Sequence, residues 1–287
     1  MRKLKLSKVN ISEKIILITG ANRGIGYAVA NELAKVNSSL ILACRNKSEG
    51  LKAKEKIEIT SGNKKICVLP LDLASFSSIR RFCKEFSKYF QRLDVLINNA
   101  GIFTMDEEKT EDNLEMTMGI NYFGTFLLTN LLIPFLEKSK EGRIINVVSD
   151  AFKKGKLDVK NIEKSQTKGM KAYTASKYAL VQFTTLLAEK VGGTNISVNA
   201  VHPGHVNSGI WNFNKWYAPI FRLFSKAFMS NSTEGAIPIL HLALSEEGKN
   251  INGKYFKKER EEEIEKMDNE DQIKLWRKSK EIVGGLN

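Results

Sequence analysis

Two residues that could carry acid–base chemistry, Tyr173 and Lys177, stand four positions apart. On a helix this spacing puts both side chains on one face, so the Lys177 ammonium would lie near the Tyr173 hydroxyl and favour its phenolate. A free tyrosine, with a pKa of about 10, is too weak a base at neutral pH. The pair could then act as a general acid or base. Such a pair also arises by chance, and Tyr173 could be an interfacial packing residue, so the surroundings decide.

Six apolar runs of strand length alternate with helical patterns along the chain. They cover residues 14–20, 39–44, 65–72, 93–100, 143–149 and 196–204. Each is rich in Ile, Leu and Val, as expected for strands buried on both faces of a parallel sheet. The alternation predicts an α/β fold with a doubly wound parallel sheet of the Rossmann type. Such sheets bind ligands at the carboxyl ends of their strands.

The first run leads into a glycine-rich turn, TGANRGIGYAVA at residues 19–30. Gly20, Gly24 and Gly26 let the backbone turn sharply and approach a pyrophosphate. The helix that follows offers unpaired N–H groups and a positive dipole end. A glycine-rich turn can be no more than a tight connection, but its place between a first strand and an amphipathic helix predicts a dinucleotide site.

The glycine spacing, Gly-x-x-x-Gly-x-Gly, together with Tyr-x-x-x-Lys resembles the short-chain dehydrogenase/reductase family. Further motifs of that family follow in its order: LDL with Asp72, NNAG at 98–101, Asn121 opening a helix, Ser149 ending the fifth strand, and HPG at 202–204. The resemblance is dense over about residues 12–210. With no break in composition before about residue 205, we expect 1–287 to form a single dinucleotide-binding catalytic domain, with 205–232 as a substrate lid and 257–287 as a C-terminal extension.

The resemblance also implies roles. Tyr173 would be the acid or base, Lys177 would hold the nicotinamide ribose, Ser149 would donate to the substrate oxygen, and Asn121 would support a proton relay. Asp72 would lie near the adenine and Asn99 on the nicotinamide side. The full set implied to bind the cofactor is Gly20, Asn22, Arg23, Gly24, Ile25, Gly26, Arg45, Asp72, Leu73, Asn99, Ala100, Gly101, Tyr173, Lys177, Pro203, Gly204 and Val206. Taken singly, Ser149 could be a strand-end cap and Asn121 a helix N-cap.

The end of the second strand indicates which cofactor is used. An acidic residue there commonly binds the adenosine ribose diol of NAD, but the sequence reads LILACRN and has none. Arg45 follows the strand instead, and Arg23 stands in the glycine turn, so two guanidinium groups could flank a 2′-phosphate. Either could be a plain surface arginine, yet together they predict NADP(H).

One spacing narrows the resemblance to a branch of the family. Ser149 precedes Tyr173 by 24 residues, where about a dozen is the family's commonest spacing. The longer gap resembles the retinol dehydrogenase-like branch, whose members share CRN, TEGA, GKYF and a late LW motif. All four occur, at 44–46, 233–236, 253–256 and 275–276.

The segment at 211–228 stands where the family places its substrate lid. Its aromatic face suits a lipophilic aldehyde or ketone, and its basic face could rest on an anionic membrane surface. An ordinary lid helix packed on the core is an equal alternative.

The N-terminus shows no apolar anchor of the kind many retinoid-active relatives carry, which weakens the case for both a membrane and a retinoid. The acidic run at 257–271 is expected to be a solvated helix face or loop. His202, His205 and His241 are interpreted as structural.

The net charge and the cysteine and histidine content limit which binding partners are expected. The formal charge is +13, but the lysines are spread along the chain outside any nucleic-acid motif, so we expect a solvated surface and no nucleic acid. Three cysteines without a Cys-x-x-Cys pair and three histidines outside ligand spacing predict no metal. With no signal-peptide core we expect a cytoplasmic protein, peripheral on an intracellular membrane if the lid binds one. The resemblance implies pairing of copies through the helices that begin at Asn121 and Tyr173.

The sequence thus predicts an NADP(H)-dependent oxidoreductase that acts on the carbonyl or alcohol of a hydrophobic small molecule. The alternative is a nucleotide-binding regulatory or scaffolding protein that keeps the fold without turnover. A membrane-surface lipid-binding protein is a further alternative, based only on the lid and the charge.

Overall fold

The computed structural model describes residues 14–164, 168–204 and 232–286. Its strands are β1 (Ile15–Thr19), β2 (Ser39–Cys44), β3 (Ile66–Pro70), β4 (Val95–Asn98), β5 (Gly142–Val147), β6 (Ile196–His202), β7 (Tyr255–Lys257) and β8 (Arg260–Glu262). They form one sheet in the order β3-β2-β1-β4-β5-β6-β7-β8. All neighbours pair in parallel except β7 and β8, which form an antiparallel hairpin. The doubly wound α/β fold predicted from the sequence is confirmed.

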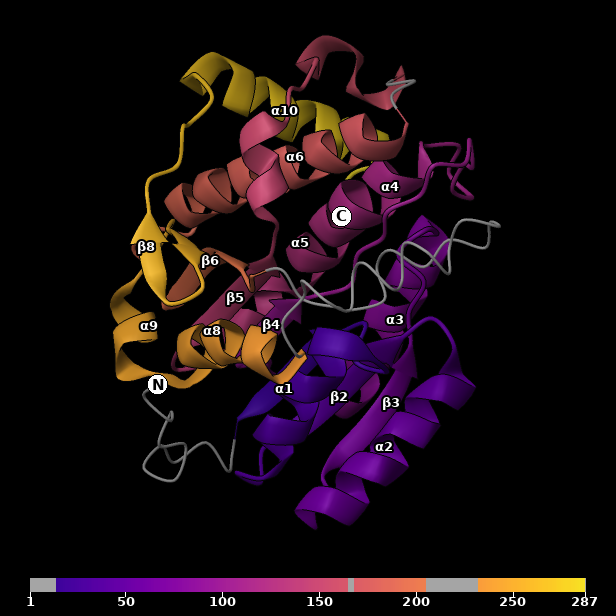
Figure 1. Cartoon of the computed structure of the whole chain (residues 1–287), viewed down its shortest axis with the longest axis vertical. Helices are drawn as coiled ribbons and strands as arrows, with labels where there is room; N and C mark the ends of the chain where they lie inside the picture. The colour runs from indigo at the N-terminus through magenta and orange to yellow at the C-terminus, as the bar shows by residue number, and fades with distance from the viewer. Residues whose placement is uncertain (1–13, 165–167, 205–231, 287) are drawn as a thin grey trace.

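Helices cover both faces of this sheet (Figure 1). They are α1 (Gly24–Ala34), α2 (Lys47–Ser61), α3 (Phe76–Tyr89), α4 (Met116–Met118), the π-helical η2 (Gly119–Gly124), α5 (Thr125–Leu136), the 3₁₀ helices η3 (Asp150–Lys154) and η4 (Val159–Lys164), α6 (Gly169–Lys190), α8 (Ser232–Leu244), α9 (Glu246–Asn250) and α10 (Asn269–Ile282). Apolar residues of α1 and α8 form one core with one face of the sheet. Those of α3, α5, α6 and α10 form the other core. In β1, Ile16 and Ile18 enter the first core and Leu17 the second, as alternation along a strand requires.

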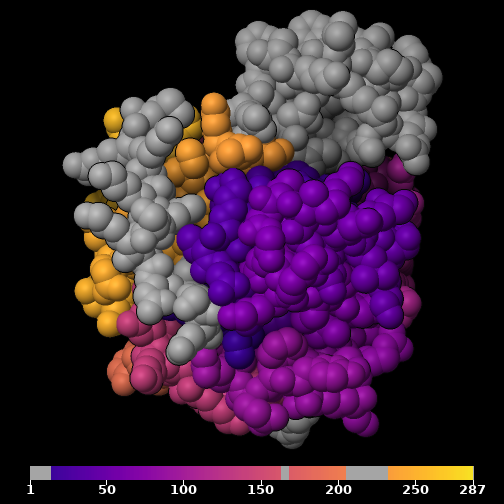
Figure 2. Space-filling model, turned by 90° about the horizontal axis from the view of Figure 1, so that it is seen from below, coloured from indigo at the N-terminus to yellow at the C-terminus, as the bar shows by residue number. Residues whose placement is uncertain are grey.

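The first core joins segments that lie far apart in sequence. Figure 2 shows the orange surface of α8 next to the indigo and purple surface of the N-terminal part of the chain. At the level of side chains, Val29 of α1 and Ile239 of α8 are both fully buried in that core. Residues beyond 232 therefore complete the dinucleotide-binding half rather than forming a separate unit.

The six predicted strands all form. The acidic run at 257–271 follows its prediction at 263–268, which is loop, but not throughout. Part of it is the strand β8, paired with β7 through Tyr255 opposite Glu262, and α10 begins only at Asn269. Strand pairing overrides the helical tendency of the glutamates, because without β8 the backbone of β7 would be an unpaired sheet edge. Within the described residues, one helical segment, 116–136, passes for a membrane span by length and composition alone. Most of it is buried inside the domain, where an apolar core helix is expected.

Candidate active site

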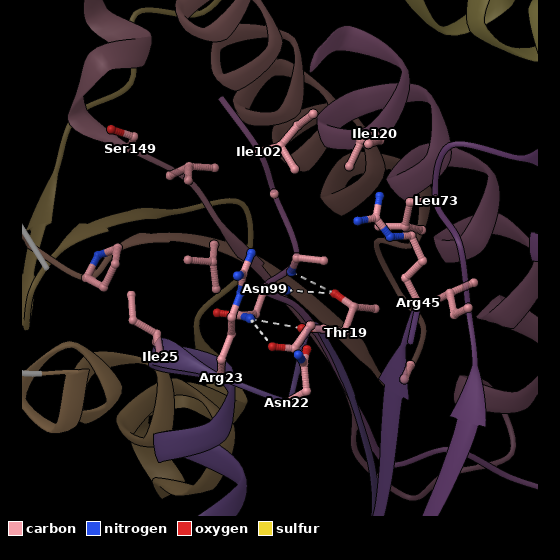
Figure 3. A pocket seen from close by; sticks show the side chains of 18 of the residues that line it. Thr19, Asn22, Arg23, Ile25, Arg45, Leu73, Asn99, Ile102, Ile120 and Ser149 are labelled. Atoms are coloured by element: carbon pink, nitrogen blue, oxygen red, sulfur yellow. Dashed lines mark hydrogen bonds between the residues drawn. The ribbon is translucent and has the colours of Figure 1, made fainter. Parts of the chain in front are cut away.

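A cavity of about 430 Å³ lies at the carboxyl ends of the central strands. It opens where the strand order reverses between β1 and β4, which is the ligand crevice of a doubly wound sheet. Arg45 and Asn22 lie toward one end of this cavity and Ser149 lies at the other (Figure 3). The cavity therefore has a guanidinium group toward one end and a hydroxyl group at the other.

The turn between β1 and α1 needs its glycines. Gly20 and Gly24 have φ angles of 66° and 57°, in the left-handed region that glycine adopts at little cost. A Cβ on Gly26 would lie 2.5 Å from both the Gly20 carbonyl oxygen and Asn99 Nδ2, so any larger residue would push the turn open. The N-cap residue Arg23 makes no side-chain capping hydrogen bond. The first N–H groups of α1 thus suit an anionic group, as the glycine pattern predicts.

Asn99 links the glycine turn to the end of β4. Its Nδ2 donates to the Thr19 carbonyl at 2.9 Å, and its backbone N–H donates to Thr19 Oγ1 at 3.0 Å (Figure 3). Thr19 Oγ1 also accepts from Ala100 N at 2.9 Å. These bonds fix the floor of the cavity at the point where the strand order reverses.

Two arginines line the cavity from different strands. Arg23 lies in the turn after β1 and Arg45 directly after β2 (Figure 3). Neither guanidinium forms an ion pair with any residue in the described part of the chain. Two carboxylates also line the cavity, those of Asp72 and Glu49, and Glu49 is bound at 2.9 Å by Lys52. The positive charge of the two arginines is therefore available to an anionic ligand.

Ser149 and Tyr173 meet at the other end of the cavity. Ser149 follows β5, and Tyr173 lies in α6 and is 5% exposed. Burial raises the pKa of Tyr173 above its ordinary value, and a hydrogen bond with the Ser149 side chain acts in the opposite direction. The net shift is upward, not downward as the spacing to Lys177 predicts, because the phenolate would lose its water. Tyr173 is thus a neutral phenol at neutral pH, a form that can donate a proton.

Lys177 is buried one helical turn after Tyr173. Its Nζ donates to the Val147 carbonyl at 3.1 Å and lies 5.9 Å from the centre of the Tyr173 ring. Burial lowers the pKa of Lys177 to about 8. The lysine is therefore cationic at neutral pH but close to its titration range, so it can hold or pass a proton.

Asn121 lies inside a continuous helix and not at its start. It is in η2, a π-helical turn between α4 and α5, and such turns are frequent at functional sites. Its Oδ1 accepts from Ile102 N at 2.8 Å, while its Nδ2 donates to Ile102 O at 2.9 Å and Ser176 Oγ at 3.1 Å. The expected helix opening and the N-cap alternative are both wrong. The side chain connects the segment after β4 to α6.

Because residue 101 is a glycine, the polar atoms of Asn121 and Lys177 can both lie next to it. A Cβ on Gly101 would lie 3.2 Å from Asn121 Oδ1 and 3.4 Å from Lys177 Nζ. Both polar atoms therefore border the same glycine. The NNAG segment thus contributes a gap for the two side chains as well as part of the cavity wall.

Most of the predicted residues line the cavity. They are Gly20, Asn22, Arg23, Ile25, Arg45, Asp72, Leu73, Asn99, Ala100, Gly101, Ser149, Tyr173, Lys177, Pro203 and Gly204. Gly24 and Gly26 shape the turn behind it, and Asn121 lies beside it. Val206, His205 and the aromatic lid at 211–228 lie outside the described residues.

Several lining residues were not predicted. They are Thr19, Ala43, Asn46, Glu49, Leu71, Ile102, Ile120, Val147, Val148 and His202. Most are apolar strand-end or loop residues, whose types carry no chemical signal. His202 is interpreted as structural from the sequence, yet it lines the cavity. Its position directly before Pro203 and Gly204 is the sequence feature that could have placed it there.

Comparison with known proteins agrees with this site. The family model for short chain dehydrogenases matches residues 14–217, and the chain belongs to this family of oxidoreductases. Human retinol dehydrogenase 14 is 40% identical over 293 residues, which cover 95% of this chain and 87% of that protein. Human retinol dehydrogenase 12 is 37% identical over 282 residues, covering 97% and 89%. The retinol dehydrogenase-like branch predicted from the serine–tyrosine spacing is confirmed.

Solved structures share the fold. An uncharacterized protein from Mycobacterium paratuberculosis superposes with a TM-score of 0.76 at 26% identity, covering 98% of this chain and 97% of that one. The Pseudomonas aeruginosa RhlG/NADP active-site complex gives a TM-score of 0.68 at 25% identity, covering 86% and 96%.

Proposed function

We propose that this protein is an NADP(H)-dependent oxidoreductase that transfers a hydride between the nicotinamide and a carbonyl or alcohol of a hydrophobic small molecule. The observation that carries the proposal is the hydrogen-bonded pair of Tyr173 and Ser149 in the wall of one cavity, with the buried Lys177 one turn along α6. A protein that only binds nucleotide has no need for this pair.

The residues of the cavity fit the proposed cofactor. The glycine turn and the uncapped start of α1 would hold the pyrophosphate. Arg23 and Arg45 would hold the 2′-phosphate, for which guanidinium groups are well shaped. Support also comes from the NADP named in the P. aeruginosa complex of the same fold. Preference for NADP(H) over NAD(H) follows from the two arginines and from the pairing of Glu49 with Lys52.

In this proposal each side chain moves or positions a proton. When bound, the nicotinamide supplies or accepts the hydride. In the reductive direction the Tyr173 hydroxyl donates its proton to the substrate oxygen. Ser149 donates a hydrogen bond to the same oxygen and orients it toward Tyr173. Lys177, with a pKa of about 8, restores the proton and stabilises the transient phenolate through its charge.

The proposed substrate is lipophilic, and retinoids are included because the relatives are named retinol dehydrogenases. The walls of the cavity include Ile102, Ile120 and Val148, which suit an apolar molecule. The aromatic lid that also favours such a substrate lies outside the described residues. A cytoplasmic location with peripheral membrane contact stays a prediction for the same reason.

Turnover with a panel of carbonyl compounds tests the proposal. We expect NADPH oxidation with at least one of retinals, aliphatic aldehydes, steroids or quinones. Tyr173→Phe should abolish this turnover and leave NADPH binding intact, because the ring stays and only the proton donor is lost. Tyr178→Phe is the matched control, since Tyr178 lies on the same helix outside the cavity. NADPH binding without turnover of any compound would favour the regulatory or scaffolding alternative.

A further inference from the structure

The residue after Ser149 reaches across the sheet to a strand that is remote in sequence. Asp150 begins the 3₁₀ helix η3, and Ser149 is its N-cap, accepting from Ala151 N at 3.3 Å. The Asp150 carboxylate accepts from the Tyr255 hydroxyl at 2.8 Å and binds Lys257 Nζ at 2.5 Å. Both partners belong to β7. One strand thus holds both oxygens of the carboxylate beside Ser149.

The strand order explains why this contact forms. β6 lies between β5 and β7, with Ala200 opposite Tyr255 and His202 opposite Lys257. Residues two apart on a strand share a face, so Tyr255 and Lys257 both present their side chains to η3. Asp150 reaches them past the end of β6.

Tyr255 holds η3 in a second way. Its ring packs edge-on against Phe152, with ring centres 4.9 Å apart at 78°. Tyr255 is 0% exposed and Phe152 is 3% exposed. Because a fully buried ring has little freedom to move, β7 anchors η3 through an apolar contact and through a hydrogen bond one residue after Ser149.

The carboxylate stays ionised across the working pH range. Burial acts to raise the pKa of Asp150, but hydrogen bonds from Lys257 and Tyr255 and the charge of His202 outweigh it and hold the pKa at about 2. Lys153, which also binds Glu262 at 2.7 Å, faces Asp150 at 3.3 Å. The anchor therefore does not switch off near neutral pH.

We propose that Asp150, held by Tyr255 and Lys257, is a positioning residue that fixes Ser149 against the Tyr173 hydroxyl. The proposal rests on the proposed function of Ser149 and Tyr173. Asp150 acts through Ser149 and is not among the residues that line the cavity. Loss of the anchor should therefore impair catalysis and spare cofactor binding.

A double-mutant cycle in kcat tests this role. Asp150→Asn should lower kcat about tenfold and leave the Kd for NADPH within about twofold. In a Ser149→Ala background, whose residual rate is measured by single turnover, Asp150→Asn should have no further effect, because residues that act as a unit are not additive. Independent, multiplicative effects would overturn the proposal.

Tyr255→Phe is the second variant, because it keeps every charge and the packing against Phe152. We expect it to lower kcat and to shift the pH profile of kcat so that the apparent pKa assigned to Tyr173 rises, since a displaced Ser149 no longer lowers it. An unchanged profile and kcat would overturn the positioning role. Asp158→Asn is the control, since Asp158 is an exposed carboxylate eight residues along the same segment.

The outcome separates this inference from the proposed function. If Ser149→Ala and Tyr173→Phe retain full turnover, the proposed function and the positioning role both fail. If these two variants lose turnover while Asp150→Asn and Tyr255→Phe match the Asp158→Asn control, only the positioning role fails.

Discussion

At the scale of single residues, Lys177 combines a large electrostatic cost with a proposed catalytic role. It is 3% exposed, and burial lowers its pKa to about 8 from an ordinary value of 10.5. The folded state therefore binds fewer protons than the unfolded state between these values, and the penalty of the buried charge is fully present below pH 8. Stability should rise with pH through this window as the lysine loses its charge.

Lys177→Met should consequently abolish turnover while raising the free energy of unfolding by roughly 1–3 kcal/mol at pH 7, since about 1.4 kcal/mol accompanies each pKa unit. This gain in the free energy of unfolding should shrink as the pH approaches the pKa of free lysine. Urea unfolding monitored by circular dichroism at several pH values measures it. Lys171→Met changes an exposed residue on the same helix, so it should alter neither turnover nor the free energy of unfolding. A variant less stable than the parent at pH 7 would contradict the prediction.

Gly101 is the second sensitive residue. In Gly101→Ala the new methyl group would lie 3.2 Å from Asn121 Oδ1 and in ordinary contact, at 3.4 Å, with Lys177 Nζ, so the Asn121 side chain must move by a few tenths of an ångström. We expect kcat/KM to fall about tenfold, a loss of roughly 1.4 kcal/mol in transition-state stabilisation. Steady-state kinetics measure this, and circular dichroism should show an intact fold. If Gly101→Ala kept the kcat/KM of the parent, the side chains of Asn121 and Lys177 would have room to adjust, and the prediction would be wrong.

At the scale of elements, α10 belongs to the core of the domain and is more than an appended extension. The Trp276 ring stacks on Phe183 of α6 at 5.8 Å and meets Phe126 of α5 at 5.2 Å. The Tyr122 hydroxyl and Ser279 Oγ share a buried hydrogen bond of 2.7 Å. Because η2 carries Asn121 and α6 carries Tyr173, the C-terminal helix stabilises the elements that position the site.

Leu275→Ala should therefore lower the free energy of unfolding by about 2–4 kcal/mol, as expected for a buried leucine. Leu275 is 2% exposed, whereas Ile273 on the same helix is 62% exposed. Ile273→Ala is the matched control and should change stability by less than about 0.5 kcal/mol. Chemical denaturation measures both variants. Equal effects would place α10 outside the cooperative core.

At the scale of the whole molecule, Arg23 and Arg45 should make the thermal stability depend on which nicotinamide cofactor is bound. A ligand that binds only the folded state stabilises it by about 2.7 kcal/mol at a hundred times its Kd. NADP⁺ should therefore raise Tm more than NAD⁺ at equal concentration. Arg45→Asp should remove or reverse this difference, while Arg81→Asp, an exposed charge reversal on α3, should leave it intact. A larger Tm shift with NAD⁺ for the parent would refute the NADP(H) preference.

Assembly is the other question at this scale. The family resemblance predicts pairing through the helices that begin at Asn121 and Tyr173. In the described chain, α10 packs on α5 and α6 through Trp276, so a partner must use the remaining surface of these helices. Pairing stays a prediction. Light scattering measures the mass in solution, and a dimer that survives substitution at the exposed Ile273 would place the interface away from α10.

The sequence alone determined the sheet, the cavity and most of its polar residues. Apolar runs and glycine spacing are local features, and the topology of a doubly wound sheet brings the ends of β1, β2, β4, β5 and β6 together without further information. For this reason the positions of Gly20, Arg45, Ser149 and Tyr173 at one crevice could be predicted.

Only the tertiary structure decided the electrostatics and the long-range supports. The sequence predicts that Lys177 lowers the pKa of Tyr173, but burial dominates and raises it, and the extent of burial depends on how all the elements pack. Likewise, Asp150 meets Tyr255, 105 positions away, only because β6 places β7 beside η3. Contacts between residues so far apart follow from strand order and register, which no local pattern in the sequence encodes.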